Sequence, residues 1–464
     1  MKESRIVASS KKDMDLLNGT LWDKIIVFAV PLAFTGVLQQ LFNAADVAVL
    51  GHFVSSEAMA AVGNNVPIMG LIISLCIGLA LGANVVVARF IGMRDEERVN
   101  KAVHTAFALA VVFGIAVLIL AELATDWILG LMEVPESVME HAETYLRVFL
   151  LGMPFISVYN FLGAVYRSKG DTRTPLWALC AATVFNIAGN LFFVLVVDWG
   201  VAGVALATAL ANGLAAVILF VCLIRKPGVL HLDLKKLFAF DKDALRMMVR
   251  IGWPAGLQGM VFSLSNLVIQ SAINSLGPEV MAGSVAAFTI EINVYCFINA
   301  FGLATTTFVS QNYGAGNLER CKRATWVSMG LNFIATFVLI GFVMFFGKEL
   351  LACFTDVASV IALGWVRILY VVLPEPISVV METVSAAMRG YGYSLPPAMV
   401  TLICVCSIRI VWVYTIFLAE PTYEILMIVY PISWLVTTIV LVWLYFKHQK
   451  TLSPRRARYG NAAA

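Results

Sequence analysis

The chain has 464 residues, of which 60% are hydrophobic and 13% are charged, and its formal net charge is +3. Soluble proteins carry about 25% charged residues, so this sequence has too few polar side chains to cover a globule. The composition excludes a soluble enzyme, a nucleic-acid-binding protein and a disordered scaffold, and it indicates an integral membrane protein.

Twelve apolar runs follow one another along the chain, separated by charged or Gly- and Pro-rich breaks. Each is long enough to cross a bilayer, which takes about 20 residues of helix. They are 24–50, 59–88, 102–124, 144–166, 175–197, 200–224, 247–275, 281–311, 324–346, 360–388, 396–418 and 424–446. Prolines inside the runs predict kinked helices. These are Pro31, Pro154, Pro254, Pro374 and Pro376.

The distribution of Lys and Arg predicts the orientation. Nearly all of the 32 basic residues fall in tails and loops that twelve spans would place on one side. The positive-inside rule assigns that side to the cytoplasm, so both termini are expected there. The exceptions are Arg147, Lys348, Arg367 and Arg409.

The two halves of the chain resemble each other at an offset of about 222 residues. Each half holds six runs, an even number, so the repeat is parallel, with a pseudo-two-fold axis along the membrane normal. We therefore expect an all-α membrane protein with two six-helix lobes around a central cleft. Its parts would be an N-terminal tail 1–23, an N-lobe 24–224, a linker 225–250, a C-lobe 251–446 and a C-terminal tail 447–464.

Three motifs resemble signatures of the multidrug and toxic compound extrusion (MATE) family. They are the run from Asp46 to Gly63, the segment from Gln311 to Asn317, and the Arg389-Gly390 pair with Pro397. The likeness extends from about Trp22 to Lys447. It implies a multi-pass transporter of the cell (plasma) membrane that exports amphipathic, often cationic, organic molecules in exchange for a cation.

Asp46 lies inside the first run, and Asn186, Asn190 and Thr208 lie at a matching depth in the fifth and sixth. The asparagines are four residues apart, so they share one helix face. One carboxylate with neutral oxygens could hold Na⁺, or Asp46 could carry a proton. Hydrogen bonding between helices is the alternative for the amides and Thr208. The resemblance implies an N-lobe cation site at these four residues, with Asn190 where some members have a second aspartate, which favours H⁺.

The C-lobe has no copy of Asp46, because Ile269 occupies the matching position, and Phe262 stands where other members carry a glutamate. Glu291 and Arg409 lie at similar depths in the eighth and eleventh runs. They are expected to form a buried structural ion pair. The alternative is that Glu291 is a proton or substrate site.

Glu375 and Glu382 are seven residues apart in the tenth run, so they share a helix face. Two carboxylates on one face would favour a cationic ligand; alternatively Glu375 pairs with Arg367, and Glu382 with Arg389. Further polar residues complete the expected substrate cleft. The full set is Gln39, Asn43, Asn266, Gln270, Glu291, Glu375 and Glu382.

Absent motifs narrow the function further. No GxxxxGK[ST] motif occurs, so ATP does not drive transport, and neither HExxH nor GxSxG is present. We expect no enzymatic activity, no cofactor beyond the coupling ion H⁺ or Na⁺, and no metal beyond Na⁺ at Asp46. The expected partners are small organic substrates and membrane lipids, without nucleic acid, and the chain is expected to be a monomer.

Two other classes of protein are alternatives. A flippase for lipid-linked or polysaccharide substrates has a related architecture, but it should carry an arginine-rich cleft for phosphates. The expected intramembrane charges here are mostly acidic. A membrane receptor or membrane enzyme would leave the parallel repeat and the central carboxylate unexplained.

Overall fold

The computed structural model describes residues 14–131, 134, 136–225 and 228–452, which are almost all helical. The α-helices are α1 (Trp22–Phe53), α2 (Ser56–Gly92), α3 (Glu96–Leu131), α4 (Glu136–Leu151), α5 (Met153–Ser168), α6 (Arg173–Leu195), α7 (Gly200–Arg225), α8 (Lys242–Ser275), α9 (Pro278–Gly314), α10 (Leu318–Ala352), α11 (Ala358–Arg367), α12 (Glu375–Gly390), α13 (Leu395–Val400), α14 (Ser407–Trp412), α15 (Tyr423–Met427) and α16 (Val429–Thr451). A 3-10 turn covers Leu234–Lys236, and π-helical turns cover Ile368–Val372, Thr401–Cys406 and Val413–Phe417.

Ten segments of the described chain are long and apolar enough to cross a membrane, and two more are bent helix pairs. Helices α4 and α5 meet at 47° at Gly152, and α11 and α12 meet at 41° near Pro374. Proline lacks the N–H that would continue the preceding turn, so the helix breaks fall at Pro154, in the first turn of α5, and at Pro374 and Pro376, at the start of α12. The other two prolines expected to kink a helix, Pro31 and Pro254, lie inside α1 and α8, and both helices continue through them. With each bent pair counted as one span, the structure confirms the twelve predicted spans.

The outer surface of these helices is apolar. Leu123, Val338 and Phe345 are among the large hydrophobic side chains that are more than two-thirds exposed. Side chains of this kind are covered by lipid when a helix lies at the edge of a bundle in a bilayer.

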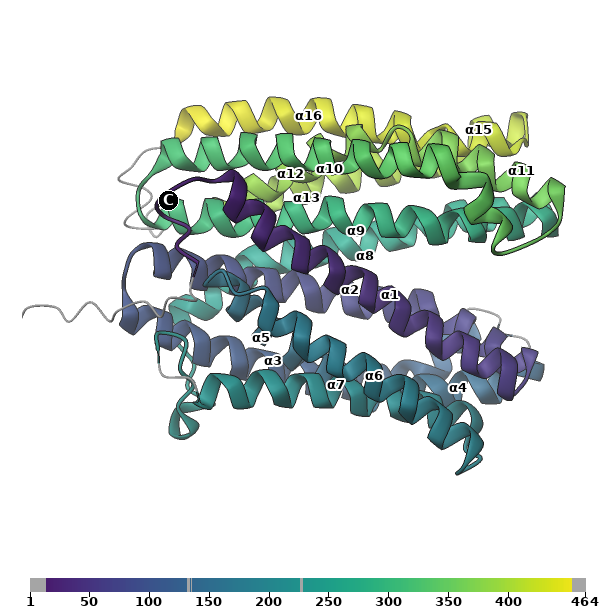
Figure 1. Cartoon of the computed structure of the whole chain (residues 1–464), viewed down its shortest axis with the longest axis horizontal. Helices are drawn as coiled ribbons and strands as arrows, with labels where there is room; N and C mark the ends of the chain where they lie inside the picture. Colours follow the sequence, from purple (N-terminus) through teal and green to yellow (C-terminus); the bar gives the residue numbers. More distant parts are fainter. Residues whose placement is uncertain (1–13, 132–133, 135, 226–227, 453–464) are drawn as a thin grey trace, which may run out of the picture.

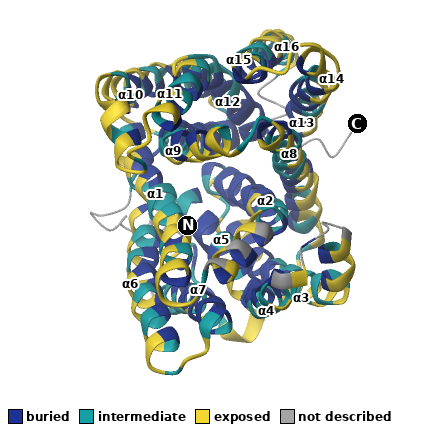
Figure 2. Cartoon of the chain, turned by 90° about the vertical axis from the view of Figure 1, so that its right-hand side faces the viewer, coloured by how far each residue is buried: buried dark blue, intermediate teal, exposed yellow. Residues whose placement is uncertain are grey.

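The helices form two lobes, the N-lobe from α1 to α7 and the C-lobe from α8 to α16, which lie one above the other in Figure 1. The view along the helices in Figure 2 shows buried residues inside both lobes and exposed residues around the rim.

Helices α1 and α8, which the repeat relates, both cross between the lobes. Near the start of α1, Phe28 packs against Phe308 of α9 with the ring centroids 5.7 Å apart, whereas Leu50 lies in the N-lobe core. In the same way Met248 of α8 lies in an N-lobe core and Ile269 in a C-lobe core. Each lobe is therefore joined to the other by the beginning of its own first helix, as the diagonal course of α1 shows (Figure 1).

The lobes are in tight contact at the end of the molecule where α2 and α9 finish. A Cβ on Gly92 of α2 would lie 1.9 Å from the carbonyl oxygen of Gln311, and a Cβ on Gly314 of α9 would lie 2.1 Å from that of Arg89. Only glycine permits this approach, because any side chain would overlap the facing backbone. We call this the basic end, since the loops there carry Arg94, Lys235 and similar residues.

Two crossed hydrogen bonds hold the basic end closed. Arg89 Nη2 of the N-lobe donates to the carbonyl oxygen of Tyr391 in the C-lobe, at 2.7 Å. Gln311 Nε2 of the C-lobe donates to the carbonyl oxygen of Ser168 in the N-lobe, at 2.6 Å. The two donor residues, Arg89 and Gln311, are separated by the repeat offset of about 222 residues, and so are the two acceptor residues, Ser168 and Tyr391. The contact between the lobes therefore has the same pseudo-two-fold symmetry as the sequence.

Candidate functional site

The structure brings together the four polar residues expected to form the N-lobe site. Asp46 of α1 is 3% exposed. Its Oδ1 accepts hydrogen bonds from Asn186 Nδ2 at 3.1 Å and Asn190 Nδ2 at 2.7 Å, both on α6. Its Oδ2 accepts a hydrogen bond from Thr208 Oγ1 of α7 at 2.7 Å. Three helices thus place their polar groups around one buried carboxylate.

The four side chains form a connected network. Asn186 Nδ2 also contacts Thr208 Oγ1 at 3.1 Å, and Asn190 Nδ2 contacts Asn186 Oδ1 at 3.4 Å. Asn190 Oδ1 is buried without a hydrogen-bond partner among the described residues. The network therefore supplies donors that stabilise the ionised carboxylate, together with an amide oxygen that is free to accept a hydrogen bond from a protonated carboxyl group or to contact a cation.

An ionised carboxylate inside a membrane span costs at least about 2.5 kcal/mol on insertion scales. No Lys or Arg of the described chain lies within ion-pair distance of Asp46. The hydrogen bonds from Asn186, Asn190 and Thr208 offset part of this cost and hold the carboxylate in one position. Such a group can exchange a small cation without first breaking a salt bridge.

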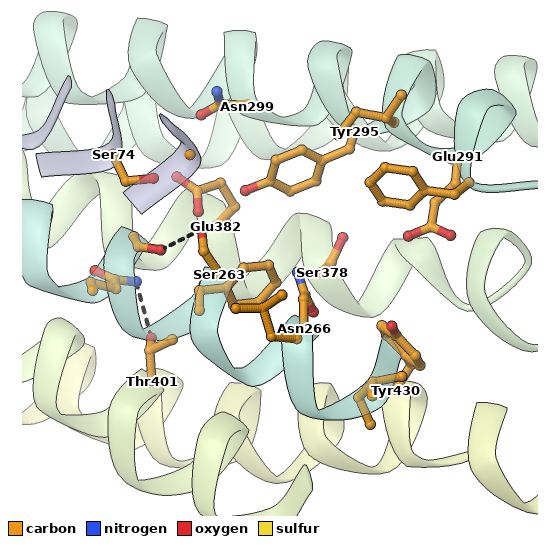
Figure 3. A pocket seen from close by; sticks show the side chains of 18 of the residues that line it. Ser74, Ser263, Asn266, Glu291, Tyr295, Asn299, Ser378, Glu382, Thr401 and Tyr430 are labelled. Carbon is orange, nitrogen blue, oxygen red and sulfur yellow. Dashed lines mark hydrogen bonds between the residues drawn. The ribbon is translucent and has the colours of Figure 1, made fainter. Parts of the chain in front are cut away.

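The C-lobe contains a cavity of about 550 Å³ lined by α8, α9, α11, α12 and α16, with α2 on its N-lobe side. Aliphatic and aromatic side chains form most of its wall, and Figure 3 shows Tyr295 between Glu382 and Glu291. A volume of this size fits a drug-like organic molecule.

The expected pair of Glu291 with Arg409 is not formed. Glu291 Oε2 accepts a hydrogen bond from Arg367 Nε at 2.8 Å, and Arg367 Nη1 donates to Ser284 Oγ at 2.9 Å. Ser284 and Glu291 are seven residues apart on α9 and so share the face that Arg367 contacts. The depth of a residue along its helix gave no information on which side of that helix faces a partner. Arg409 instead donates from Nη1 to Asn266 Oδ1 at 2.7 Å.

The two glutamates of the tenth span differ in their partners. Glu382 forms an ion pair with Arg389, which was one of the two alternatives. Glu375 does not pair with Arg367; it is 2% exposed, and its carboxylate accepts a hydrogen bond from the hydroxyl of Ser378. No cation of the described chain lies within ion-pair distance of Glu375. Glu375 is thus the unpaired carboxylate of the cavity wall.

The remaining residues expected in the cleft separate into two groups. Asn266 and Gln270 of α8 line the C-lobe cavity together with the three glutamates. Gln39 and Asn43 do not: they are exposed on α1, seven and three residues before Asp46 and on the same face.

Sequence reasoning did not pair Arg367 with Glu291, and it overlooked Ser378 and the contacts of the basic end. The repeat could have indicated the ion pair of Arg367, because Arg367 corresponds to Arg147 in the N-lobe. Arg147 forms ion pairs with Glu122, Asp126 and Glu143 in the N-lobe at 2.5–3.0 Å. An arginine at this place in each half therefore joins neighbouring helices through carboxylates.

Known proteins resemble this chain in both halves of its sequence. The MatE family model matches residues 31–192 and 254–415, two segments at the same offset as the repeat. "Probable multidrug resistance protein YoeA" of Bacillus subtilis is 26% identical over 403 residues, 84% of this chain and 86% of that protein. "Probable multidrug resistance protein NorM" of Thermotoga maritima is 28% identical over 398 residues, which are 83% of this chain and 84% of that protein. The "FAD transporter" of Shewanella oneidensis is 24% identical over 343 residues, which are 72% of this chain and 74% of that protein.

The fold is similar to that of solved structures. One is described as the outward-facing conformation of a multidrug resistance MATE family transporter of the MOP superfamily. It superimposes with a TM-score of 0.87 at 23% identity, covering 96% of this chain and 99% of that one. This likeness supports the two-lobe arrangement of twelve spans.

Proposed function

Because this chain belongs to the MatE (MATE) family of membrane transporters, we propose that it exports amphipathic, cationic organic compounds in exchange for H⁺ or Na⁺. Family membership leaves the substrate open, since related proteins are named both as multidrug resistance proteins and as an FAD transporter. The substrate and the coupling ion are therefore argued from the residues of this chain.

The observation that supports coupling most directly is the position of Asp46. It is a buried carboxylate without a cationic partner in the described chain, and it is held by donors from α6 and α7. Binding of H⁺ or Na⁺ removes its negative charge and rearranges these hydrogen bonds. The packing of α1 on α6 and α7 then changes, and α1 also contacts the C-lobe through Phe28. Occupancy of the ion site thereby alters the contact between lobes.

The basic end is proposed to face the cytoplasm of a cell (plasma) membrane protein, in agreement with its Lys and Arg residues. In the described conformation this end is closed by the Gly92–Gly314 contact. Alternating access then requires the lobes to separate at the basic end and to approach at the opposite end. Both sites form within one chain, which supports a monomeric transporter in contact with lipid.

The cavity supports a cationic substrate. Three glutamates and two arginines line it, and two of the glutamates are paired with those arginines. Glu375 remains as a buried carboxylate that a cationic substrate can neutralise. The apolar wall can accommodate rings and alkyl groups of varied shape.

The flippase alternative is less well supported. A site for lipid-linked phosphates should present several arginines free to bind them. Arg367 and Arg389, the arginines of the cavity wall, are already paired with Glu291 and Glu382.

The experiment is transport by the purified protein in proteoliposomes, with a panel of cationic and neutral amphipathic dyes. A pH gradient and a Na⁺ gradient are imposed separately. We expect accumulation of cationic dyes in response to at least one gradient, and none without a gradient. Failure of both gradients to drive any cationic dye would refute the proposal.

A further inference from the structure

Arg409 is a buried charge that the ion pairs of the C-lobe leave unmatched. It lies on α14, between two π-helical turns, and is 0% exposed. Nη1 donates to Asn266, whereas Nε and Nη2 have no hydrogen-bond partner in the described chain. No carboxylate of the described chain lies within ion-pair distance of its guanidinium group. A buried charge in this condition is costly, and a group that approaches it with negative charge is favoured.

The guanidinium of Arg409 lies directly behind one part of the cavity wall. It stacks over the ring of Tyr430 at 4.4 Å and over that of Phe262 at 5.1 Å. Tyr430, Phe262 and Asn266 all line the cavity, and Figure 3 shows Asn266 and Tyr430 there. Its electrostatic field therefore acts on the cavity through a thin layer of side chains of low polarity.

Asn266 connects this charge to the cavity. Its Oδ1 accepts from Arg409 at 2.7 Å, so the amide nitrogen is the group left for a ligand. None of the described hydrogen bonds uses that nitrogen as a donor. An amide whose oxygen is bound to a cation is also a stronger donor at its nitrogen, because linked hydrogen bonds polarise one another.

From these contacts we propose that Asn266, with Arg409 behind it, is a subsite for a carboxylate of the substrate. The preferred substrates then carry both charges: a cationic group near Glu375 and a carboxylate at Asn266. This inference rests on the proposed function, because it assumes that the cavity binds organic cations. It adds zwitterionic amphipathic compounds as the preferred class, and it makes Asn266 a specificity-determining residue.

The test compares two dyes that share one cationic ring system and differ only at a carboxyl group. Rhodamine 110 has a free carboxylate, and rhodamine 123 is its methyl ester. Fluorescence anisotropy with the purified full-length protein measures both dissociation constants. We expect the wild type to bind the acid at least about tenfold more tightly than the ester, the scale of one hydrogen bond to a charged group.

Two variants locate the subsite. Asn266→Leu removes the donor, and Asn266→Asp places a carboxylate against Arg409 with almost no change of shape. Both should lose the preference for the acid while still binding the ester. The matched control is Asn274→Leu, two turns further along α8 and exposed, which should keep the wild-type ratio. Arg409→Met should behave as Asn266→Leu does, and thermal unfolding in detergent shows which variants are folded.

The outcomes separate this inference from the proposed function. Equal affinity of the wild type for both dyes, or an unchanged acid-to-ester ratio in folded Asn266→Leu and Asn266→Asp, would overturn the subsite but leave a cation-binding cavity. Failure of both dyes to bind would overturn the cation-binding cavity as well.

Discussion

Arg367 shows how a single side chain can organise several helices in a low-dielectric interior. It reaches from α11 to Glu291 and Ser284 of α9, and its guanidinium lies 5.3 Å from the ring of Phe288 and 5.6 Å from that of Tyr430. Buried charge is tolerated there because one carboxylate, one hydroxyl and two aromatic faces surround it. The ion pair with Glu291 therefore has a structural role that can be measured.

Removal of one partner of this pair should destabilise the protein more than removal of both. Glu291→Gln or Arg367→Gln leaves an uncompensated buried charge, at a cost of about 3–5 kcal/mol, whereas the double variant should be much closer to the wild type. Thermal unfolding in detergent, with the four proteins compared, measures this coupling. Additive losses in the double variant would show that the two residues act independently.

The N-lobe site was predictable at the residue scale and the C-lobe pair was not. Asn186 and Asn190 are one helical turn apart, so their common face follows from the sequence. Glu291 and Arg409 were matched by depth alone. Depth does not determine the direction in which a side chain points around its helix. The face of α9 that carries Glu291 is contacted by Arg367 and not by Arg409.

At the scale of elements, the close contacts depend on residues that lack a side chain. Helices α2 and α9 touch at Gly92 and Gly314, next to the crossed hydrogen bonds of Arg89 and Gln311. The sequence predicted the twelve spans from apolar length. It predicted kinks at five prolines, of which Pro154 and the Pro374–Pro376 pair interrupt helices, whereas α1 and α8 continue through Pro31 and Pro254. It did not predict the π-helical turns or the crossing of α1 and α8, because these depend on contacts between distant segments.

Gly92→Ala should prevent closure of the basic end, since even a methyl group would lie 1.9 Å from a carbonyl oxygen. The conformational equilibrium should then shift toward the form that is open at this end. Spin labels on the basic-end loops of the two lobes would report a longer distance by pulsed electron paramagnetic resonance.

The matched control is Gly330→Ala on α10. A Cβ at Gly330 meets nothing within 4 Å, so this change should leave the distance unchanged and should favour the helix by up to about 1 kcal/mol. Equal distance distributions for Gly92→Ala and the wild type would contradict a closing role for the glycine contact.

At the scale of the whole molecule, sequence repeat, fold and inter-lobe contacts share one pseudo-two-fold symmetry. The buried carboxylate of Asp46 breaks this symmetry, because Ile269 occupies the corresponding position in the C-lobe. In the proposed function the N-lobe therefore carries the ion site, and the C-lobe carries the charged cavity. Under the proposed function, a change at Asp46 would reach the cavity through α1 and through α2, which lies on the cavity's N-lobe side.

The orientation of the molecule can be tested with one introduced cysteine. Cys353 is exposed at the end opposite to the basic end, so an impermeant thiol reagent should label it from outside intact cells. Lys235→Cys, in a Cys353→Ser background, should react only after the membrane is permeabilised. Labelling of position 235 in intact cells would reverse the proposed orientation.

The central claim is that Asp46 couples transport to an ion gradient. Asp46→Asn is nearly isosteric and removes the charge, so the protein should fold, insert and still bind substrate without a gradient. Its matched control is Asp198→Asn, the same chemical change in the loop between α6 and α7, outside the site. For a one-to-one exchange of H⁺ with a monovalent cationic dye, which moves no net charge, one pH unit can support a dye gradient of at most about tenfold.

The decisive measurement is dye accumulation in proteoliposomes under imposed pH or Na⁺ gradients. Wild type and Asp198→Asn should accumulate dye, and Asp46→Asn should bind dye but not accumulate it. Accumulation by Asp46→Asn in response to either gradient would contradict the assignment of Asp46 as the coupling residue.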